Sequence, residues 1–134
     1  MKKFALKTMA LVLFVSTMIS SCSSDEGGEI ITARRQEVTA VDGPTTGTVG
    51  EALTLNVSYK IDNSCGVFYR FSEVVTGQIK TIDTEVKYTG DNCPANPTTA
   101  IQPYQVTIIQ PGTYIFKFRK TGVQFITHTI VITE

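Results

Sequence analysis

The sequence predicts an all-β domain that follows an export segment. From Cys22 onward the chain contains 18 Thr, 12 Ile and 11 Val, but only two Leu, five Ala and no Met. β-Branched residues favour strands, whereas Ala, Leu and Met favour helices. Short β-like runs alternate with turn residues about every ten positions, which is typical of a β-sandwich. We therefore expect a single β-sandwich of about seven strands.

Turn signals separate the expected strands. Asp42-Gly43-Pro44 ends the first run, Thr76-Gly77 predicts a hairpin turn, and Pro111-Gly112 and Lys120-Thr121-Gly122 precede the last two strands. Residues 90–99 contain two Asn, two Pro and one Asp, so we expect a loop there. The expected strands cover residues 30–41, 52–59, 65–73, 79–89, 104–108, 114–118 and 123–133.

Alternation of residue types predicts which face of each strand lies in the core. Leu53, Leu55, Val57 and Tyr59 share one face of their run, and polar residues occupy the other. The same period groups Ile82, Thr84, Val86 and Tyr88; Tyr104, Val106 and Ile108; and Tyr114, Phe116 and Phe118. On strict alternation Phe68 and Phe125 face outward, where they could contact a protein or a sugar. The interpretation we favour is that they cover the end of the core.

Two short motifs resemble those of immunoglobulin-like domains. Pro111-Gly112-Thr113-Tyr114 resembles the tyrosine corner at the start of the penultimate strand. Val49-Gly50-Glu51 resembles the lead-in to the second strand of such domains. The resemblance implies an immunoglobulin-like Greek-key sandwich. Because the chain has no Trp and its cysteines do not lie on the strands joined in antibodies, a fibronectin-type domain or another Greek key stays an alternative.

The first residues resemble a bacterial lipoprotein signal. Lys2-Lys3 precedes a mostly apolar run over residues 4–19, which is too short for a stable membrane span and fits a secretory signal. Ile19-Ser20-Ser21-Cys22 resembles a lipobox, which implies that residues 1–21 are cleaved and that Cys22 carries acyl chains such as palmitate. The alternative is an ordinary signal peptide followed by a chance cysteine.

The residues after Cys22 predict a tether and a location. Ser23-Ser24-Asp25-Glu26 resembles the serine-then-acidic tag of surface-exported lipoproteins of the Bacteroidetes. An acidic, Gly-containing stretch is also a good solvated spacer, so we assign residues 22–29 as a flexible tether and residues 30–134 as the domain. Several acyl chains would anchor the protein stably. We expect anchoring in the outer membrane, with surface display favoured over a periplasmic position.

Two cysteines remain once Cys22 is assigned to lipid. Cys65 and Cys93 form an even pair in an exported chain, so a disulfide is the expected state. A metal site is disfavoured because the chain has one His and no CxxC spacing. The same missing motif disfavours a redox pair.

No pattern in the sequence predicts an enzyme. His128 is the only histidine, and no GxSxG elbow accompanies it, so we expect a histidine at the core or its rim with one hydrogen bond. Asp83 and Glu85 share a strand face and could serve in acid–base chemistry or bind a cation. Lys80 and Lys87 flank them, which favours a solvated face of mixed charge.

The loop over residues 90–99 is the predicted ligand-contact site. Asp91, Asn92, Asn96 and Thr98 offer polar groups for a protein or glycan ligand. Calcium binding is the alternative, but the ligand count and Gly spacing of a calcium loop are missing. No metal or other cofactor is expected.

One segment of this loop resembles a protease inhibitor motif. Asn96-Pro97-Thr98-Thr99 is similar to the start of the Asn-Pro-Thr-Thr-Gly loop of chagasin-like cysteine-protease inhibitors. Ala100 follows where that family has Gly, the segment arrives later in the chain, and the family's Trp-containing loop has no counterpart. The inhibitory residues therefore cannot be transferred, and inhibition is a remote alternative.

These features predict a non-enzymatic, lipid-anchored binding module of the cell envelope. Its partners would be the membrane, through the anchor, and a protein or glycan ligand. The chain carries 12 Lys or Arg against 12 Asp or Glu and shows no basic patch with interleaved aromatics, so nucleic acid is not an expected partner. The alternative function is a structural or accessory subunit of an outer-membrane complex.

Overall fold

A computed structural model describes residues 31–134, which form nine strands and no helix. The predicted signal peptide, Cys22, the tether and Ile30 lie outside the described residues. No helix long and apolar enough to cross a membrane occurs in the described part of the chain. The strands are β1 (Ile31–Gln36), β2 (Val38–Asp42), β3 (Thr46–Thr48), β4 (Ala52–Ile61), β5 (Gly66–Thr76), β6 (Ile79–Thr89), β7 (Thr98–Thr107), β8 (Gly112–Arg119) and β9 (Phe125–Thr133).

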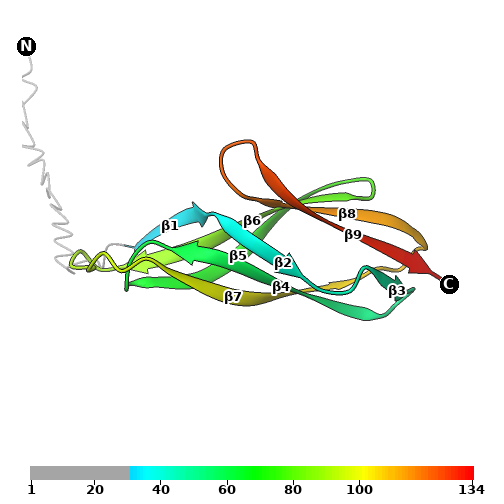
Figure 1. The fold of residues 1–134 in the computed structure, drawn as a ribbon, viewed down its shortest axis with the longest axis horizontal. Coiled ribbons are helices and arrows are strands. Elements are labelled where there is room, and N and C mark those ends of the chain that lie inside the picture. The colour runs from blue at the N-terminus through cyan, green and yellow to red at the C-terminus, as the bar shows by residue number, and fades with distance from the viewer. Residues whose placement is uncertain (1–30) are drawn as a thin grey trace, which may run out of the picture.

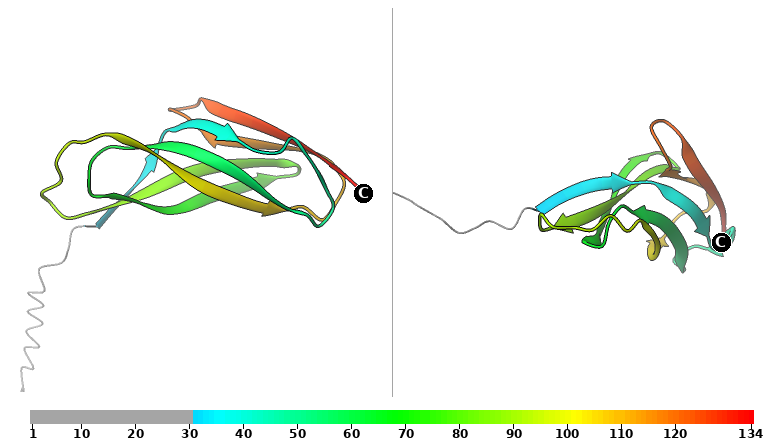
Figure 2. Two further views of the ribbon diagram at one scale, coloured as in Figure 1. Left: turned by 60° about the horizontal axis from the view of Figure 1, so that its bottom comes forward. Right: turned by 60° about the vertical axis from the view of Figure 1, so that its left-hand side comes forward.

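The strands form two sheets that pack against each other, which confirms the predicted β-sandwich (Figure 1). In the smaller sheet the order is β2-β4-β7. In the larger sheet β5 and β6 form the predicted hairpin, and β5 occupies one edge of β6. The other edge of β6 is shared, because β1 pairs antiparallel with residues 84–89 and β8 pairs parallel with residues 79–82. β9 and then β3 continue the larger sheet beyond β8 (Figure 2).

The hydrophobic core lies between the sheets and follows the predicted alternation. Leu53, Leu55, Val57 and Tyr59 are all buried, and the residues between them are exposed or half-buried. The equivalent faces of β6, β7 and β8 supply most of the other buried side chains. These are Ile82, Thr84, Val86, Tyr88, Tyr104, Val106, Phe116 and Phe118.

The structure contains two more strands than expected, partly because the first predicted run divides. β1 ends at Gln36 and β2 begins at Val38, and the two strands lie in different sheets. Gln36 turns into the sandwich, where its amide Nε2 donates to the Tyr88 hydroxyl (2.7 Å) and to the Asp62 carboxylate (2.8 Å). The other addition is β3, a strand of three residues parallel to β9.

A β-bulge in β5 brings two phenylalanines to the same face. The pairing of β5 with β6 shifts between Phe68 and Arg70, so Tyr69 is the extra residue. Phe68 and Phe71 are three positions apart, yet both pack against the core, with ring centroids 4.9 Å apart. Phe68 therefore covers the core, as in the favoured interpretation. Phe125 is half-buried and lies against the Arg119 guanidinium, whose Cζ is 4.9 Å from the ring centroid.

The two motifs that resemble immunoglobulin-like domains have the expected local geometry. The Tyr114 hydroxyl donates to the Gln110 carbonyl oxygen at 3.2 Å, which is the hydrogen bond of a tyrosine corner. Gly50 has a φ of 82°, a conformation that favours glycine, and its amide donates to the Ile108 carbonyl at 2.8 Å. The Glu51 carboxylate accepts from the Thr48 amide at 2.9 Å and closes the turn into β4.

The two ends of the described chain lie at opposite ends of the sandwich (Figure 1). Ile31 pairs with Thr89, the last residue of β6, so the chain enters the domain beside the loop that connects β6 to β7. At the other end, Thr133 of β9 pairs with Thr48 of β3. The domain therefore has an entry end and a C-terminal end.

Candidate functional site

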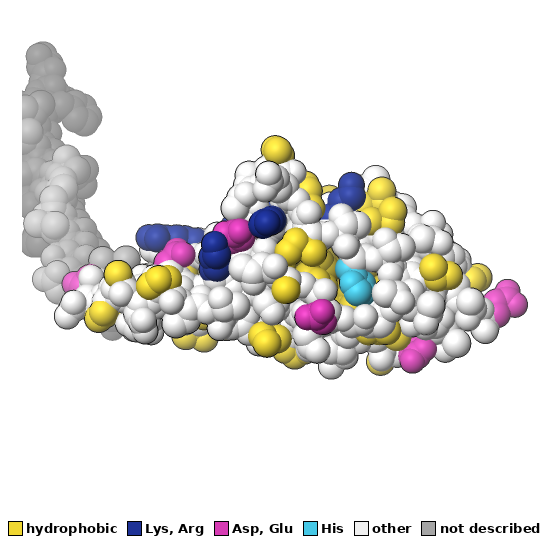
Figure 3. All heavy atoms as spheres, viewed as in Figure 1, with side chains coloured by type: hydrophobic (Ala, Val, Ile, Leu, Met, Phe, Trp, Pro, Cys, Tyr) yellow, Lys and Arg dark blue, Asp and Glu magenta, His cyan; other side chains and the backbone are white. Residues whose placement is uncertain are grey.

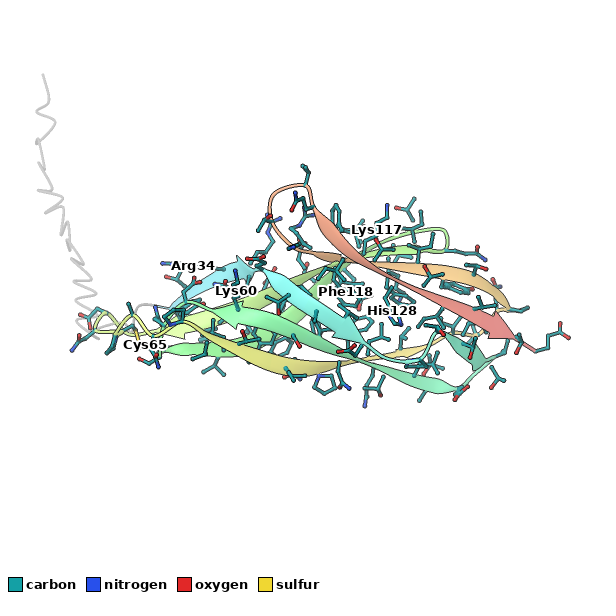
Figure 4. The ribbon with its side chains drawn as sticks, in the orientation of Figure 1. Arg34, Lys60, Cys65, Lys117, Phe118 and His128 are labelled. Atoms are coloured by element: carbon teal, nitrogen blue, oxygen red, sulfur yellow. A yellow bond between two sulfur atoms is a disulfide. The ribbon has the colours of Figure 1, made fainter. Side chains whose placement is uncertain are left out.

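The predicted ligand-contact loop is an exposed segment at the entry end. Asp91, Asn92 and Asn96 are exposed between β6 and β7, and Thr98 is the exposed first residue of β7. The expected disulfide joins Cys93 of this loop to Cys65, with Cα atoms 5.6 Å apart, a normal separation for a disulfide (Figure 4).

The segment that resembles a protease inhibitor loop is divided between a loop and a strand. Asn96 and Pro97 end the connection after β6, whereas Thr98 and Thr99 belong to β7. In β7 these two threonines pair with Ile61 and Lys60 of β4. The four residues therefore do not form one open loop.

His128 lies at the rim of the core with one hydrogen bond, as expected. It is half-buried on the face of β9 that also carries Ile126 and Ile130, and its Nε2 is 2.9 Å from the Pro44 carbonyl oxygen (Figure 4). Among residues 31–134, no three His, Cys, Asp or Glu side chains gather as they would around a metal ion.

Asp83 and Glu85 lie on the outer face of the larger sheet, where arginines pair with them. Glu85 accepts from Arg70 Nε at 2.8 Å. Asp83 accepts from both Arg35 Nη1 (3.3 Å) and Arg119 Nε (2.5 Å). The sequence predicted a face of mixed charge from the neighbouring lysines. The observed partners come instead from β1, β5 and β8.

Asp83 marks the point where two strands diverge from the same edge of β6. β1 runs antiparallel to β6 and its pairing ends with Gln36 opposite Thr84. β8 runs parallel to β6 and its pairing ends with Phe118 opposite Ile82. The carboxyl ends of β1 and β8 therefore face each other across Asp83. After β1 the chain crosses to β2 of the smaller sheet, and after β8 it enters the loop that leads to β9.

The Arg119 side chain is held in place at this junction. Its Nε donates to Asp83, its Nη1 donates to the Gly122 carbonyl at 2.9 Å, and its guanidinium lies against the Phe125 ring. Only 26% of its side chain is exposed, compared with 61% for Arg35. Arg119 is thus fixed from the β8–β9 loop and from β6, while Arg35 reaches the same carboxylate from β1.

A cleft of about 430 Å³ opens at the junction, which we call the junction cleft. Its walls include Arg35, Gln36 and Glu37 on one side and Arg119, Lys120 and Thr121 on the other. Figure 3 shows Lys and Arg side chains gathered over this part of the surface, with acidic side chains among them. Glu37 is paired with Lys60 at 2.6 Å. The junction cleft is therefore a cationic concavity between the end of β1 on one side and the end of β8 with the loop after it on the other.

The junction cleft has no specific signature in the sequence pattern. Lys117 and Arg119 alternate with Phe116 and Phe118, a pattern that is typical of any exposed sheet face. Arg35 lies 48 residues from Asp83 and Arg119 lies 36 residues from it, so only strand register brings the three together. The available signal was the basic composition of two strand ends, Arg34-Arg35 and Arg119-Lys120.

A second, more apolar hollow lies on the same sheet near the entry end. Ile31, Ala33, Tyr69 and Lys87 line a space of about 330 Å³. Tyr69 is 50% exposed and Ile31 is 53% exposed, and Val67 beside them is 66% exposed. We call this surface the apolar groove. Exposed apolar side chains that lie together are a common feature of protein contact sites.

No protein-family model, curated protein or solved structure matches this chain.

Proposed function

We propose that the protein is a lipid-anchored, non-enzymatic binding module of the bacterial cell envelope. The lipobox-like Ile19-Ser20-Ser21-Cys22 supports the anchor, and the serine-then-acidic residues after it support an outer-membrane, surface-facing position. The observation that carries the binding function is the junction cleft, a concavity of about 430 Å³ with cationic side chains in its walls. This volume lies within the usual range for small-ligand sites.

The proposal moves the binding surface away from the loop over residues 90–99. That loop lies beside Ile31, at the end of the domain from which the tether would lead to the membrane. The junction cleft lies at the far end of β1 from Ile31, so a ligand would approach it from the side of the domain. Arg35, Gln36 and Arg119 of the cleft lie on strands, which hold side chains more firmly than loops do.

The anchor is tested by the mass of the protein extracted from membranes. The wild-type chain is expected to lack residues 1–21 and to carry the added mass of acyl chains on Cys22. The Cys22→Ser variant is the control and is expected to be released from the membrane fraction. A wild-type chain without acyl mass would contradict the anchor.

The orientation is tested by protease treatment of intact cells. A surface-displayed domain is expected to be digested while a periplasmic control protein survives. Protection of the domain in intact cells, with digestion after lysis, would place it on the periplasmic side.

The binding function is tested by capture. The mature protein in detergent is expected to bind a member of a glycan array or, when immobilised, to retain a ligand from culture material. An Arg35→Gln/Lys120→Gln variant with unchanged folding is expected to lose that ligand. Retention of the ligand by this variant would exclude the junction cleft as the binding surface.

The apolar groove favours a second candidate function, an accessory subunit that contacts another envelope protein. Apolar surface is exposed on β1 by Ile31 and on β5 by Val67 and Tyr69. The outer edge of β5 pairs with no other strand in the described part of the chain. Exposed strand edges can pair with a partner. Copurification of one fixed neighbour, lost in Tyr69→Ser, would support this function over ligand capture.

A further inference from the structure

We propose that the junction cleft binds an oxyanion, a carboxylate or a phosphate or sulfate group carried by a small ligand or a glycan. This inference rests on the proposed binding function and names the chemistry that the cleft would recognise. It follows from three properties of the cleft: its local charge, the donors that its arginines still have available, and the contacts by which Asp83 holds these arginines together.

The cleft is positive on a domain that is neutral. Residues 31–134 contain nine Lys or Arg and nine Asp or Glu. At the cleft, Arg35 and Arg119 share a single carboxylate, Asp83, and Glu37 is already paired with Lys60. Lys120 has no carboxylate within 4.0 Å among the described residues. Two positive charges in this group are therefore left without a local counter-charge, which favours an anionic ligand.

The arginines still have donors to offer. A guanidinium carries five N–H groups in a planar fork that matches the geometry of carboxylate and phosphate oxygens. Arg35 uses one donor on Asp83, and Arg119 uses one on Asp83 and one on Gly122. The remaining N–H groups belong to side chains that line the cleft, and the Lys120 ammonium adds a further donor from the adjacent loop.

Asp83 bridges the two arginines in addition to reducing the charge of the site. One carboxylate oxygen accepts from Arg119 and the other accepts from Arg35, so the carboxylate holds the two guanidinium groups near each other. The Phe125 ring supports Arg119 from a further side. A ligand would then meet donors that are already oriented, and less conformational entropy would be lost on binding.

The experiment is a calorimetric titration of the full mature chain, purified in neutral detergent. The probes are tetragalacturonate for carboxylates, inorganic phosphate and sodium sulfate, with neutral tetragalactose as the control. We expect at least one oxyanion probe to bind and its affinity to fall as the ionic strength is raised to about 0.15 M. The probe with the highest affinity of the three identifies whether the oxyanion is a carboxylate, a phosphate or a sulfate.

Four variants connect binding to the cleft. Arg35→Gln and Lys120→Gln are each expected to weaken the affinity for the bound probe about three- to tenfold. Arg119→Lys is expected to weaken it as well, because the charge is kept but the planar fork is lost. Lys117→Gln is the matched control, since Lys117 lies on β8 two residues before Arg119 and does not line the cleft (Figure 4). Its affinity is expected to stay within about twofold of the wild type.

The inference is overturned if no oxyanion probe binds, if tetragalactose binds equally well, or if Lys117→Gln weakens binding as much as Lys120→Gln. Because Lys120 lies in a loop, its variant keeps the test decisive even if a substitution of Arg119 prevents folding. A wild-type chain that is acylated and captures an uncharged ligand also overturns the inference, but leaves the proposed binding function intact.

Discussion

Leu55 illustrates how a single position on an alternating strand contributes to stability. Its side chain is completely buried between the sheets, whereas the neighbouring Thr54 is exposed. We expect Leu55→Ala to lower the free energy of unfolding by about 2–5 kcal/mol, because the substitution leaves a cavity in a packed core. Thr54→Ala is the matched control, with an expected change within about 0.5 kcal/mol. Urea denaturation measures both, and equal losses would show that the assigned faces are wrong.

Tyr114 contributes a single hydrogen bond whose loss can be measured. Its hydroxyl donates to the Gln110 carbonyl at 3.2 Å and links β8 to the connection that precedes it. We expect Tyr114→Phe to lower the free energy of unfolding by about 0.5–1.5 kcal/mol. Tyr69→Phe removes a hydroxyl from a half-exposed tyrosine on β5 and is the control. A Tyr114→Phe variant as stable as wild type would show that the corner hydrogen bond adds nothing.

Residue type predicted most of the buried positions but not the exceptions to alternation. Leu53, Val57 and Phe118 follow a simple period of two and are buried as expected. Phe68 is an exception. The bulge at Tyr69 adds one residue to β5, so the residues before it face the opposite side of the sheet from the one that strict alternation with the residues after it predicts. No Gly or Pro marks this bulge, so the sequence carries no local signal for it.

At the level of elements, the disulfide joins the start of β5 to the connection between β6 and β7. It closes a loop in which the two cysteines are 28 positions apart. In the chain-entropy account, losing such a loop closure lowers the free energy of unfolding by about 3–4 kcal/mol. We expect a Cys65→Ser/Cys93→Ser variant to show a loss of that size in urea denaturation.

Reduction of the wild-type protein provides the control for this prediction. Dithiothreitol is expected to lower the stability of the wild type toward that of the double variant and to leave the double variant unchanged. A double variant as stable as the oxidised wild type would show that the crosslink does not stabilise the domain.

The junction cleft depends on how elements pair, and pairing was the least predictable feature of the sequence. Turn residues located the strands, including the β5–β6 hairpin. They did not reveal that β1 and β8 share one edge of β6, or that the run after residue 30 serves both sheets. Strand neighbours far apart in sequence are set by the packing of the whole domain. A site built from Arg35, Asp83 and Arg119 could therefore not be assembled from local patterns.

For the molecule as a whole, buried tyrosines predict a loss of stability in alkaline solution. Burial raises the pKa of Tyr59, Tyr88 and Tyr104 above the ordinary value. Above pH of about 10 the unfolded chain releases protons that the folded chain retains, so rising pH favours unfolding. We expect urea midpoints to change little up to pH of about 9 and then to fall with a steepening slope.

Replacing one buried tyrosine tests whether tyrosine ionisation causes the loss of stability in alkaline solution. Tyr104→Phe is expected to reduce the slope of stability against pH above about pH 10, because one titrating group is removed. An unchanged slope in Tyr104→Phe, or a wild-type domain equally stable at alkaline pH, would contradict a contribution from buried tyrosines.

The position of the junction cleft at the end of β1 also has a mechanical consequence. In an anchored protein that holds a bound ligand, tension would enter at Ile31 and leave at the junction cleft, through Arg35 of β1 and Arg119 of β8. β1 pairs antiparallel with β6 over six residues, from Ile31 to Gln36. The hydrogen bonds of such a pair run across the strands. The part of the load that leaves through β8 would pass from β1 to β6 and would load these bonds together, in shear, instead of opening them one by one. The Arg35–Asp83–Arg119 contacts at the far end of β1 would share that load with β8. The domain would thus resist being pulled away from its membrane while its ligand is held.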